Sequence, residues 1–191
     1  MFIYLISSYL IGNFLAAWWV GKWKGIDLRN ERSGNLGARN AGAVIGKTAF
    51  LLTFLGDAGK GALVVFLGFY FNFDLWIVAL GGLLVICGHL FPFWLKGRGG
   101  KGIAAFIGVT FFLTPELFLA MLVIFLAFYP FLKSATLSML ASYTAFIGMA
   151  AVSQVTPVVW PLIIAIIIIV YKHQFDVKES FHNRFGKPDQ Q

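Results

Sequence analysis

Long apolar runs dominate this chain, and they limit its possible folds more than any other feature. Seven runs are apolar enough to be helices in a lipid bilayer, at residues 2–20, 49–73, 75–95, 103–115, 117–132, 135–152 and 157–171. Inside lipid, only helices or closed barrels satisfy every backbone polar group, and a helix needs about 20 apolar residues to cross. Charged residues make up 12% of the 191 residues, against about a quarter in an average globular protein. We therefore expect an all-α, polytopic membrane helix bundle of about seven transmembrane helices, in a single domain over residues 1–191.

The run at 103–115 leaves the number of crossings open. At about 1.5 Å per residue it reaches about 20 Å, less than a hydrocarbon core about 30 Å thick. It either crosses a locally thinned bilayer or forms a re-entrant pair with the next run, which gives a five-span version. The first run lacks a basic segment before it, so we expect a retained helix and not a cleaved signal peptide. The single cysteine, Cys87, excludes an internal disulfide.

Positive charge gathers on one side of the expected bundle. Of the fifteen Lys and Arg residues, fourteen lie in the segments that alternate to that side: 21–48, 96–102, Lys133 and 172–191. The connections on the other side, near residues 74, 116 and 154, carry none. The positive-inside rule then predicts an external N-terminus and a cytoplasmic C-terminus, with cytoplasmic loops 21–48 and 96–102 and a cytoplasmic tail 172–191. This sidedness explains the net charge of +7 without nucleic acid as a partner.

Two basic, glycine-rich segments interrupt the apolar runs. Glycine lets backbone N–H groups approach an anion closely, and Arg and Lys supply positive charge. The first segment, 32–40, offers donors suited to phosphate oxygens: Ser33, Gly34, Asn35, Gly37, Arg39 and Asn40. It is equally compatible with a flexible turn whose basic residues touch anionic lipid head groups.

The second segment, 96–102, leads directly into an apolar run. The residues that would converge on an anion at that helix start are Arg98, Gly99, Gly100, Lys101 and Gly102. The spacing is not that of a P-loop, and no strand precedes it. A tight turn with snorkelling cations is the alternative, but such a turn needs one glycine and not four, so anion binding is favoured.

Few ionisable residues lie within or beside the apolar runs. Asp57 and Lys60 are three residues apart, share a helix face and can pair, either at a functional site or as a structural ion pair near the interface. His89 and His173 stand at the cytoplasmic ends of their runs, where a lone histidine is more often a hydrogen-bonded structural residue than a base. No histidine has an aspartate five residues later, which excludes the HxxxxD arrangement used by one large class of glycerolipid acyltransferases. No cluster has metal-ligand spacing.

Together these residues resemble the bacterial acyl-phosphate:glycerol-3-phosphate acyltransferase family, the PlsY type. The resemblance covers nearly the whole chain and rests on three blocks in order: Ser33-Gly34-Asn35-Leu36-Gly37-Ala38-Arg39-Asn40 with Asp57-Ala58-Gly59-Lys60-Gly61, then Gly88-His89 to Pro92 with Gly99-Gly100-Lys101-Gly102, and last Lys172-His173. It implies acyl transfer from acyl phosphate to the 1-hydroxyl of glycerol-3-phosphate, giving lysophosphatidate and phosphate in phospholipid biosynthesis. It also implies a multi-pass protein of the bacterial plasma membrane, with membrane lipids around it and its active site facing the cytoplasm.

The resemblance also assigns roles to residues. The expected catalytic residues are Ser33, His89, Lys101 and His173. The expected phosphate-binding residues are Gly34, Asn35, Gly37, Arg39, Asn40, Lys60, Arg98, Gly99, Gly100 and Gly102. No metal and no cofactor is expected. Acyl phosphate is a mixed anhydride and is already activated, so the protein need not form an acyl-enzyme.

The sequence departs from the family pattern at a few positions. Arg39 stands where the family has Thr, and Ala43 where it has Arg. In the third block, Asp176 occupies the position of a neutral Asn and would weaken phosphate binding nearby. The alternative function is a non-catalytic membrane protein that binds or transports phosphorylated lipids or small anions. The absence of an internal repeat, and the gathering of polar residues on one side, favour the enzyme.

Overall fold

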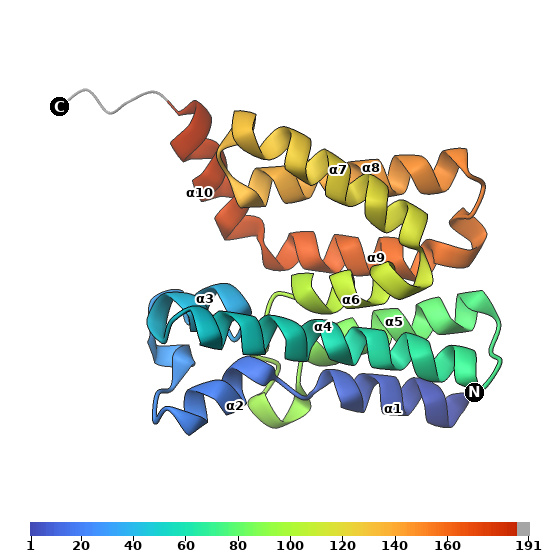
Figure 1. Ribbon diagram of the computed structural model, residues 1–191, viewed down its shortest axis with the longest axis horizontal. Coiled ribbons are helices and arrows are strands. Elements are labelled where there is room, and N and C mark those ends of the chain that lie inside the picture. Colours follow the sequence, from blue (N-terminus) through green and yellow to red (C-terminus); the bar gives the residue numbers. More distant parts are fainter. Residues whose placement is uncertain (187–191) are drawn as a thin grey trace.

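The computed structural model describes residues 1–186, and throughout this part of the chain the regular structure is helical. Each of the seven predicted apolar runs is helical for most of its length (Figure 1). The elements are α1 (Phe2–Gly12), α2 (Ala16–Trp23), η1 (Leu28–Asn30), α3 (Ala38–Val44), α4 (Lys47–Tyr70), α5 (Leu75–Leu90), η2 (Phe93–Leu95), α6 (Ile103–Leu113), α7 (Pro115–Leu132), α8 (Ala135–Val152), α9 (Thr156–Lys172) and α10 (Gln174–Phe185).

The long helices lie side by side in a bundle, with α6 near its middle (Figure 1). On one side α4 packs against α6, α3 and α5, and α1 packs against α5. On the other side α7 packs against α8, and α9 joins the two parts by contacting α5 and α8. Figure 1 shows α3 and α10 at one end of the bundle and the α4–α5 and α8–α9 connections at the other. The basic segments therefore gather at one end, as the charge pattern predicts.

Glycines allow two pairs of helices to approach until their backbones touch. A Cβ on Gly61 of α4 would lie 2.4 Å from the carbonyl oxygen of Ala105, and one on Gly108 of α6 would lie 1.9 Å from that of Ala58. In the same way, a Cβ on Gly12 of α1 would lie 3.0 Å from the Cα of Gly88 in α5. Small residues at helix crossings are typical of membrane bundles, where close van der Waals packing replaces the hydrophobic driving force. These two crossings fix α4 and α5, which carry the buried polar groups of the site.

The structure corrects three expectations. The first run is not one helix, because the chain breaks between α1 and α2 at residues 13–15. The predicted loop 21–48 contains the end of α2, η1 and α3, and the predicted tail forms α10, with residues 187–191 outside the described part.

The expected number of seven spans stays a prediction. Within residues 1–186, five helical segments are long and apolar enough to cross a membrane by themselves: Phe2–Trp23, Lys47–Tyr70, Leu75–Leu95, Pro115–Leu132 and Ala135–Val152. A sixth qualifies only as the pair α9 and α10, which is bent by 64°, and α6 is shorter. Only 11% of the apolar window in α7 is buried, so this helix presents most of its surface outward, as lipid contact requires.

Candidate functional site

The first glycine-rich segment is held in place by one buried side chain, Asn40 of α3. Its Nδ2 donates to the carbonyl oxygens of Leu28 at 3.0 Å and Glu31 at 3.2 Å, and its Oδ1 accepts from the backbone N–H of Ser33 at 3.4 Å. Gly34 has φ +65°, a left-handed conformation that glycine adopts without strain. Because all of these contacts are internal, Asn40 shapes the segment, and Ser33 lies exposed upon it.

The second glycine-rich segment folds back over the end of α5. The backbone N–H groups of Gly99 and Gly100 donate to the carbonyl oxygens of Leu90 and His89, at 3.3 and 3.1 Å. A Cβ on Gly100 would lie 2.1 Å from Nε2 of His89 and 2.7 Å from the carbonyl oxygen of Leu36. The two segments therefore meet at Gly100, where no side chain fits.

A polar cavity of about 240 Å³ lies between the two segments. Its lining comes from both of them and from the turn before the first: Arg29, Asn30, Gly34, Arg98 and Gly99. Two guanidinium groups and two glycines around one small cavity form a site that suits a phosphate group, because guanidinium forms paired hydrogen bonds to its oxygens.

The guanidinium group of Arg29 is already hydrogen-bonded to a carboxylate of the chain. Arg29 donates from Nε to Oδ1 of Asp27 at 2.9 Å and from Nη2 to Oδ2 at 2.7 Å. These hydrogen bonds lower the pKa of the Asp27 carboxyl to about 2. Both side chains are partly exposed, so the pair is accessible to a competing anion.

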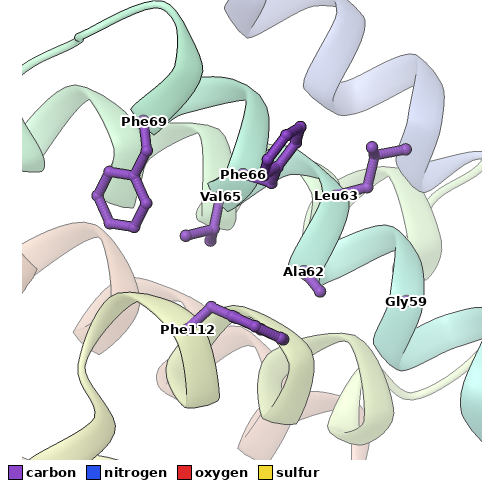
Figure 2. A pocket seen from close by; sticks show the side chains of 7 residues that line it. All are labelled: Gly59, Ala62, Leu63, Val65, Phe66, Phe69 and Phe112. Carbon is purple, nitrogen blue, oxygen red and sulfur yellow. The ribbon is translucent and has the colours of Figure 1, made fainter.

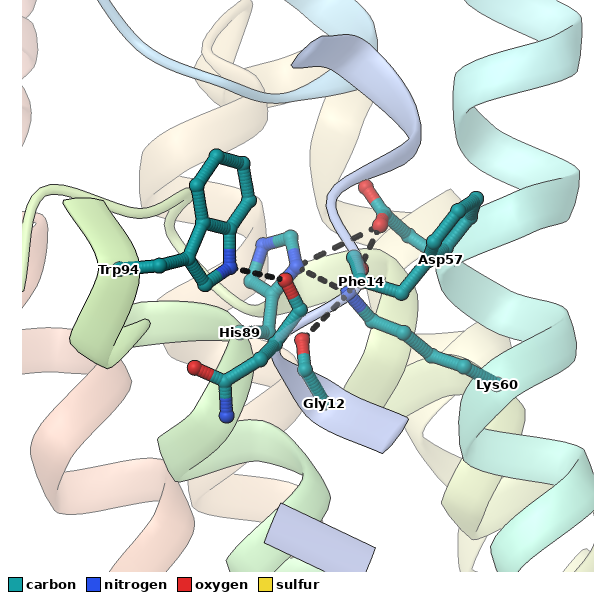
Figure 3. Close-up of polar contacts among 7 residues, drawn as sticks. Gly12, Phe14, Asp57, Lys60, His89 and Trp94 are labelled. Atoms are coloured by element: carbon teal, nitrogen blue, oxygen red, sulfur yellow. Dashed lines mark hydrogen bonds and ion pairs between the residues drawn. The ribbon is translucent and has the colours of Figure 1, made fainter. Parts of the chain in front are cut away.

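Beneath the second segment, three ionisable side chains form a buried cluster (Figure 3). Nζ of Lys60 lies 3.0 Å from Oδ1 of Asp57 and 2.7 Å from Nδ1 of His89, and His89 Nδ1 lies 3.4 Å from the same carboxylate oxygen. Nζ also donates to the carbonyl oxygens of Gly12 at 3.1 Å and Phe14 at 2.6 Å, at the break between α1 and α2. The predicted pairing of Asp57 with Lys60 is confirmed. The two carbonyl oxygens at the α1–α2 break accept the remaining hydrogen bonds of the Lys60 ammonium.

Asn13 ties the same break to η2. Its Oδ1 accepts from the backbone N–H of Phe93 at 2.9 Å, and its Nδ2 donates to the carbonyl oxygen of Tyr9 at 2.7 Å. Nε1 of Trp94 donates to the backbone carbonyl of Asn13 at 3.0 Å (Figure 3). The break is thus hydrogen-bonded to Phe93 and Trp94 in η2, the turn that leads into the second glycine-rich segment.

Lys101 is held by a residue from the far end of the sequence. Its Nζ forms an ion pair with Oδ2 of Asp176 in the first turn of α10. His173, at the bend between α9 and α10, is buried, and its Nδ1 lies 2.8 Å from the carbonyl oxygen of Ile169, where it donates a hydrogen bond in the matching tautomer. The third block of the sequence therefore reaches the second one through Asp176.

An apolar groove of about 310 Å³ lies between α4 and α6 on the outer face of the bundle (Figure 2). Its lining is made of glycine and hydrophobic side chains: Gly59, Ala62, Leu63, Val65, Phe66, Phe69 and Phe112. Gly59 precedes Lys60 in α4, so the groove begins at the level of the buried cluster and runs away from it. A surface of this kind accommodates a hydrocarbon chain.

The structure brings together many, but not all, of the predicted site residues. Gly34, Arg98 and Gly99 share the cavity, while Gly100, His89 and Lys60 form the layer beneath it. Arg39 is exposed and does not line the cavity. Asn35 and Gly37 lie beside each other, since a Cβ on Gly37 would be 2.8 Å from Nδ2 of Asn35.

Sequence reasoning missed several residues of the site. Arg29 and Asn30 line the cavity although they precede the glycine-rich segment. Asn13 also escaped notice, although a Gly-Asn pair inside an apolar run is a common signal for a helix end. Within residues 1–186, no three His, Cys, Asp or Glu side chains gather as metal ligands would.

Known proteins are similar to this chain in sequence and in fold. The family model described as Glycerol-3-phosphate acyltransferase matches residues 2–183. The chain belongs to the glycerol-3-phosphate acyltransferase family. Members similar to it include glycerol-3-phosphate acyltransferase 1 of Bacillus cereus (strain ATCC 10987 / NRS 248), 43% identical over 173 residues, which are 88% of this chain and 95% of that one. Another is glycerol-3-phosphate acyltransferase of Aquifex aeolicus (strain VF5), 30% identical over 94% of this chain and 95% of the relative.

Solved structures of this family share the fold. A crystal structure of PlsY (YgiH), an integral membrane glycerol 3-phosphate acyltransferase, in its glycerol 3-phosphate form superposes with a TM-score of 0.88 at 27% identity. The match covers 96% of this chain and 92% of that one. Its lysophosphatidic acid form gives a TM-score of 0.84 at 26% identity. The family resemblance drawn from the motifs and the expected integral membrane fold are thereby confirmed.

Proposed function

We propose that this chain transfers an acyl group from acyl phosphate to the 1-hydroxyl of glycerol-3-phosphate, giving lysophosphatidate and phosphate. Membership of the glycerol-3-phosphate acyltransferase family supports the acceptor and the reaction class. In this chain itself, the main support for the proposal is the cavity between the two glycine-rich segments, which has Arg29 and Arg98 in its lining. Two basic segments that converge on one point suit a reaction between two phosphate-bearing substrates.

The chemistry needs electrostatic stabilisation more than a protein nucleophile. The acceptor hydroxyl attacks the carbonyl carbon of acyl phosphate, the new ester bond forms, and the bond from that carbon to the phosphate oxygen breaks. The hydroxyl proton passes to a phosphate oxygen, so no protein base is obligatory. Cationic side chains and backbone N–H groups that hold both anions close supply orientation and offset the charge on the leaving phosphate.

The geometry supports different roles for the predicted residues. Lys101 and Arg98 supply charge beside the glycine backbone, and the exposed Ser33 hydroxyl is free to donate to a phosphate oxygen. His89 is 2% exposed and lies under Gly100, with Nδ1 beside Lys60, so it acts as a positioning residue. His173 holds the junction that presents Asp176 to Lys101. The apolar groove between α4 and α6 offers a place for the acyl chain.

The site faces the cytoplasm in this proposal. The basic segments gather at the end of the bundle that carries α3 and α10 (Figure 1), and positive residues favour the cytoplasmic side. Both small substrates would then reach the cavity from the cytoplasm.

The test is acyl transfer in vesicles. Purified full-length protein is supplied with labelled glycerol-3-phosphate and either acyl phosphate or acyl-CoA, with a known family member assayed in parallel. Lysophosphatidate should form from acyl phosphate, and formation only from acyl-CoA would refute the proposed donor. If neither donor gives product while the reference enzyme is active, the proposed function is wrong.

A matched pair of variants tests the cavity. Arg98→Gln should lower kcat/KM for glycerol-3-phosphate at least tenfold, because it removes a guanidinium from the cavity lining. Lys96→Gln removes the same charge two residues away, outside the lining, and should change it less than twofold. Equal losses in both variants would show that bulk charge, and not the cavity, binds the substrate.

A further inference from the structure

Lys101 and Asp176 are 75 residues apart in the sequence, and their ion pair connects the segment before α6 to the first turn of α10. Lys101 stands just before α6, next to the N-cap residue Gly102, whose φ is +87°. Its side chain is 28% exposed and that of Asp176 is 32% exposed, so water and solutes reach both groups. A solute anion therefore meets an ammonium that already has a carboxylate partner.

Asp176 is brought to this place by the way α10 is anchored. Helix α10 bends away from α9 by 64° at His173, so its first turn lies at the end of the bundle that carries the glycine-rich segments. At its other end, Nη2 of Arg184 donates to the carbonyl oxygen of Phe131 at 2.9 Å. Since both ends of α10 are tied down, the carboxylate of Asp176 is presented to Lys101 by the fold.

A carboxylate at this position opposes the binding of phosphate. Lys101 offers a single positive charge, and the neighbouring negative charge both occupies one of its donors and repels an incoming dianion. A phosphate group gains the full attraction of the ammonium only when it displaces the carboxylate.

We propose that Asp176 is an internal competitor for the phosphate groups that bind at Lys101, and that it sets how tightly substrate and product phosphates are held. The inference rests on the proposed function only in placing a phosphate at Lys101. The carboxylate weakens the ground-state binding of phosphate and favours its release, so it tunes KM and product inhibition more than the chemical step. The opposite role, in which Asp176 aims Lys101 at the substrate, predicts the reverse effect of removing its charge.

The experiment measures phosphate binding first, without turnover. Inorganic phosphate is titrated into purified full-length protein by calorimetry, for the wild type and for Asp176→Asn. The variant should bind phosphate about twofold to fivefold more tightly, which lies within the range expected when an exposed ion-pair partner is removed. Glu179→Gln removes the same charge from an exposed position farther along α10 and should leave the affinity unchanged, while Asp176→Glu should resemble the wild type.

Kinetics and a second background complete the test. In Asp176→Asn, KM for glycerol-3-phosphate and the inhibition constant of phosphate should fall by a similar factor, while kcat changes less than twofold. In a Lys101→Gln background, Asp176→Asn should have no effect on phosphate affinity. Weaker phosphate binding in Asp176→Asn, equal shifts in Glu179→Gln, or an effect that persists without Lys101 would each overturn the proposal.

These experiments distinguish a failure of the proposed acyl transfer from a failure of the proposed role of Asp176. If the wild type makes no lysophosphatidate but Asp176→Asn still tightens phosphate binding through Lys101, the proposed function is wrong and the competitor role stands. Should Asp176→Asn prove unstable in detergent, Asp176→Ser removes the same charge with a smaller side chain and must give the same tighter binding.

Discussion

Among residues 1–186, two Asp–Lys pairs have different surroundings, and the difference distinguishes a lysine that supports the fold from one that a substrate can reach. Lys60 and Asp57 are 4% and 2% exposed, in the middle of the helix bundle. Around Lys60 the carboxylate, two backbone carbonyls and an imidazole leave no donor for a substrate (Figure 3). Lys101 is 28% exposed, and among the described residues its ammonium has one polar partner, Asp176. The same chemical pair therefore holds the fold in one place and meets solutes in the other.

The largest expected effect comes from breaking the buried pair. Lys60→Met takes the ammonium away from the buried Asp57 carboxylate, leaving His89 beside it, and removes the donor to the carbonyls of the α1–α2 break. This should cost about 3–5 kcal/mol of stability. Lys101→Met should cost less than about 1 kcal/mol, because a partly exposed pair contributes little, yet acyl transfer should fall at least tenfold.

The single cysteine provides the measurement. Cys87 is only partly accessible in the folded chain, so a fluorogenic thiol probe reports thermal unfolding in detergent. Similar losses of stability in Lys60→Met and Lys101→Met would contradict the conclusion that Lys60 stabilises the fold and Lys101 acts in the reaction.

The next effect concerns the contact between the buried cluster and the glycine-rich segment above it. Gly100→Ala places a methyl group 2.1 Å from Nε2 of His89, so either the segment or the imidazole must move. We expect acyl transfer to fall at least tenfold, since small displacements at a site that holds two anions are costly.

Gly148→Ala in α8 is the matched control for this change. A Cβ at Gly148 meets no atom within 4 Å, and Gly148 lines neither the cavity nor the groove, so the protein should keep both its activity and its stability. Full activity in Gly100→Ala would mean that His89 does not position the segment.

The sequence predicted the parts of this structure that depend on local patterns. The apolar runs form helices as expected, and the three-residue spacing of Asp57 and Lys60 correctly predicted their pairing. The α1–α2 break was missed because an apolar run conceals a helix end when only two residues, Gly12 and Asn13, mark it. The partner of Lys101 was missed because it is 75 residues away, and only the bend after α9 brings it near.

The candidate site was predicted in its glycine-rich half and less well in its surroundings. The resemblance singled out the residues of both segments, and three of these line the cavity. Arg29 stayed outside the motif because nothing local distinguishes it from other basic residues between the first two runs. It reaches the cavity only because Asn40 folds the turn before the first segment back upon it.

The smallest effect is expected at the most exposed acid–base pair, Asp27 and Arg29. Because the pKa of Asp27 is about 2 in the folded chain, below its usual range, the pair adds stability above about pH 4 and loses it as the pH falls toward 2. Both side chains are about 40% exposed, so solvent screens this contribution, and Asp27→Asn should shift the unfolding temperature at pH 7 by less than about 2 °C. The variant frees Arg29 toward the cavity, so KM for glycerol-3-phosphate should fall by at most about twofold, less than in Asp176→Asn. A larger fall than in Asp176→Asn would reverse the order and show that the cavity, and not Lys101, dominates phosphate affinity.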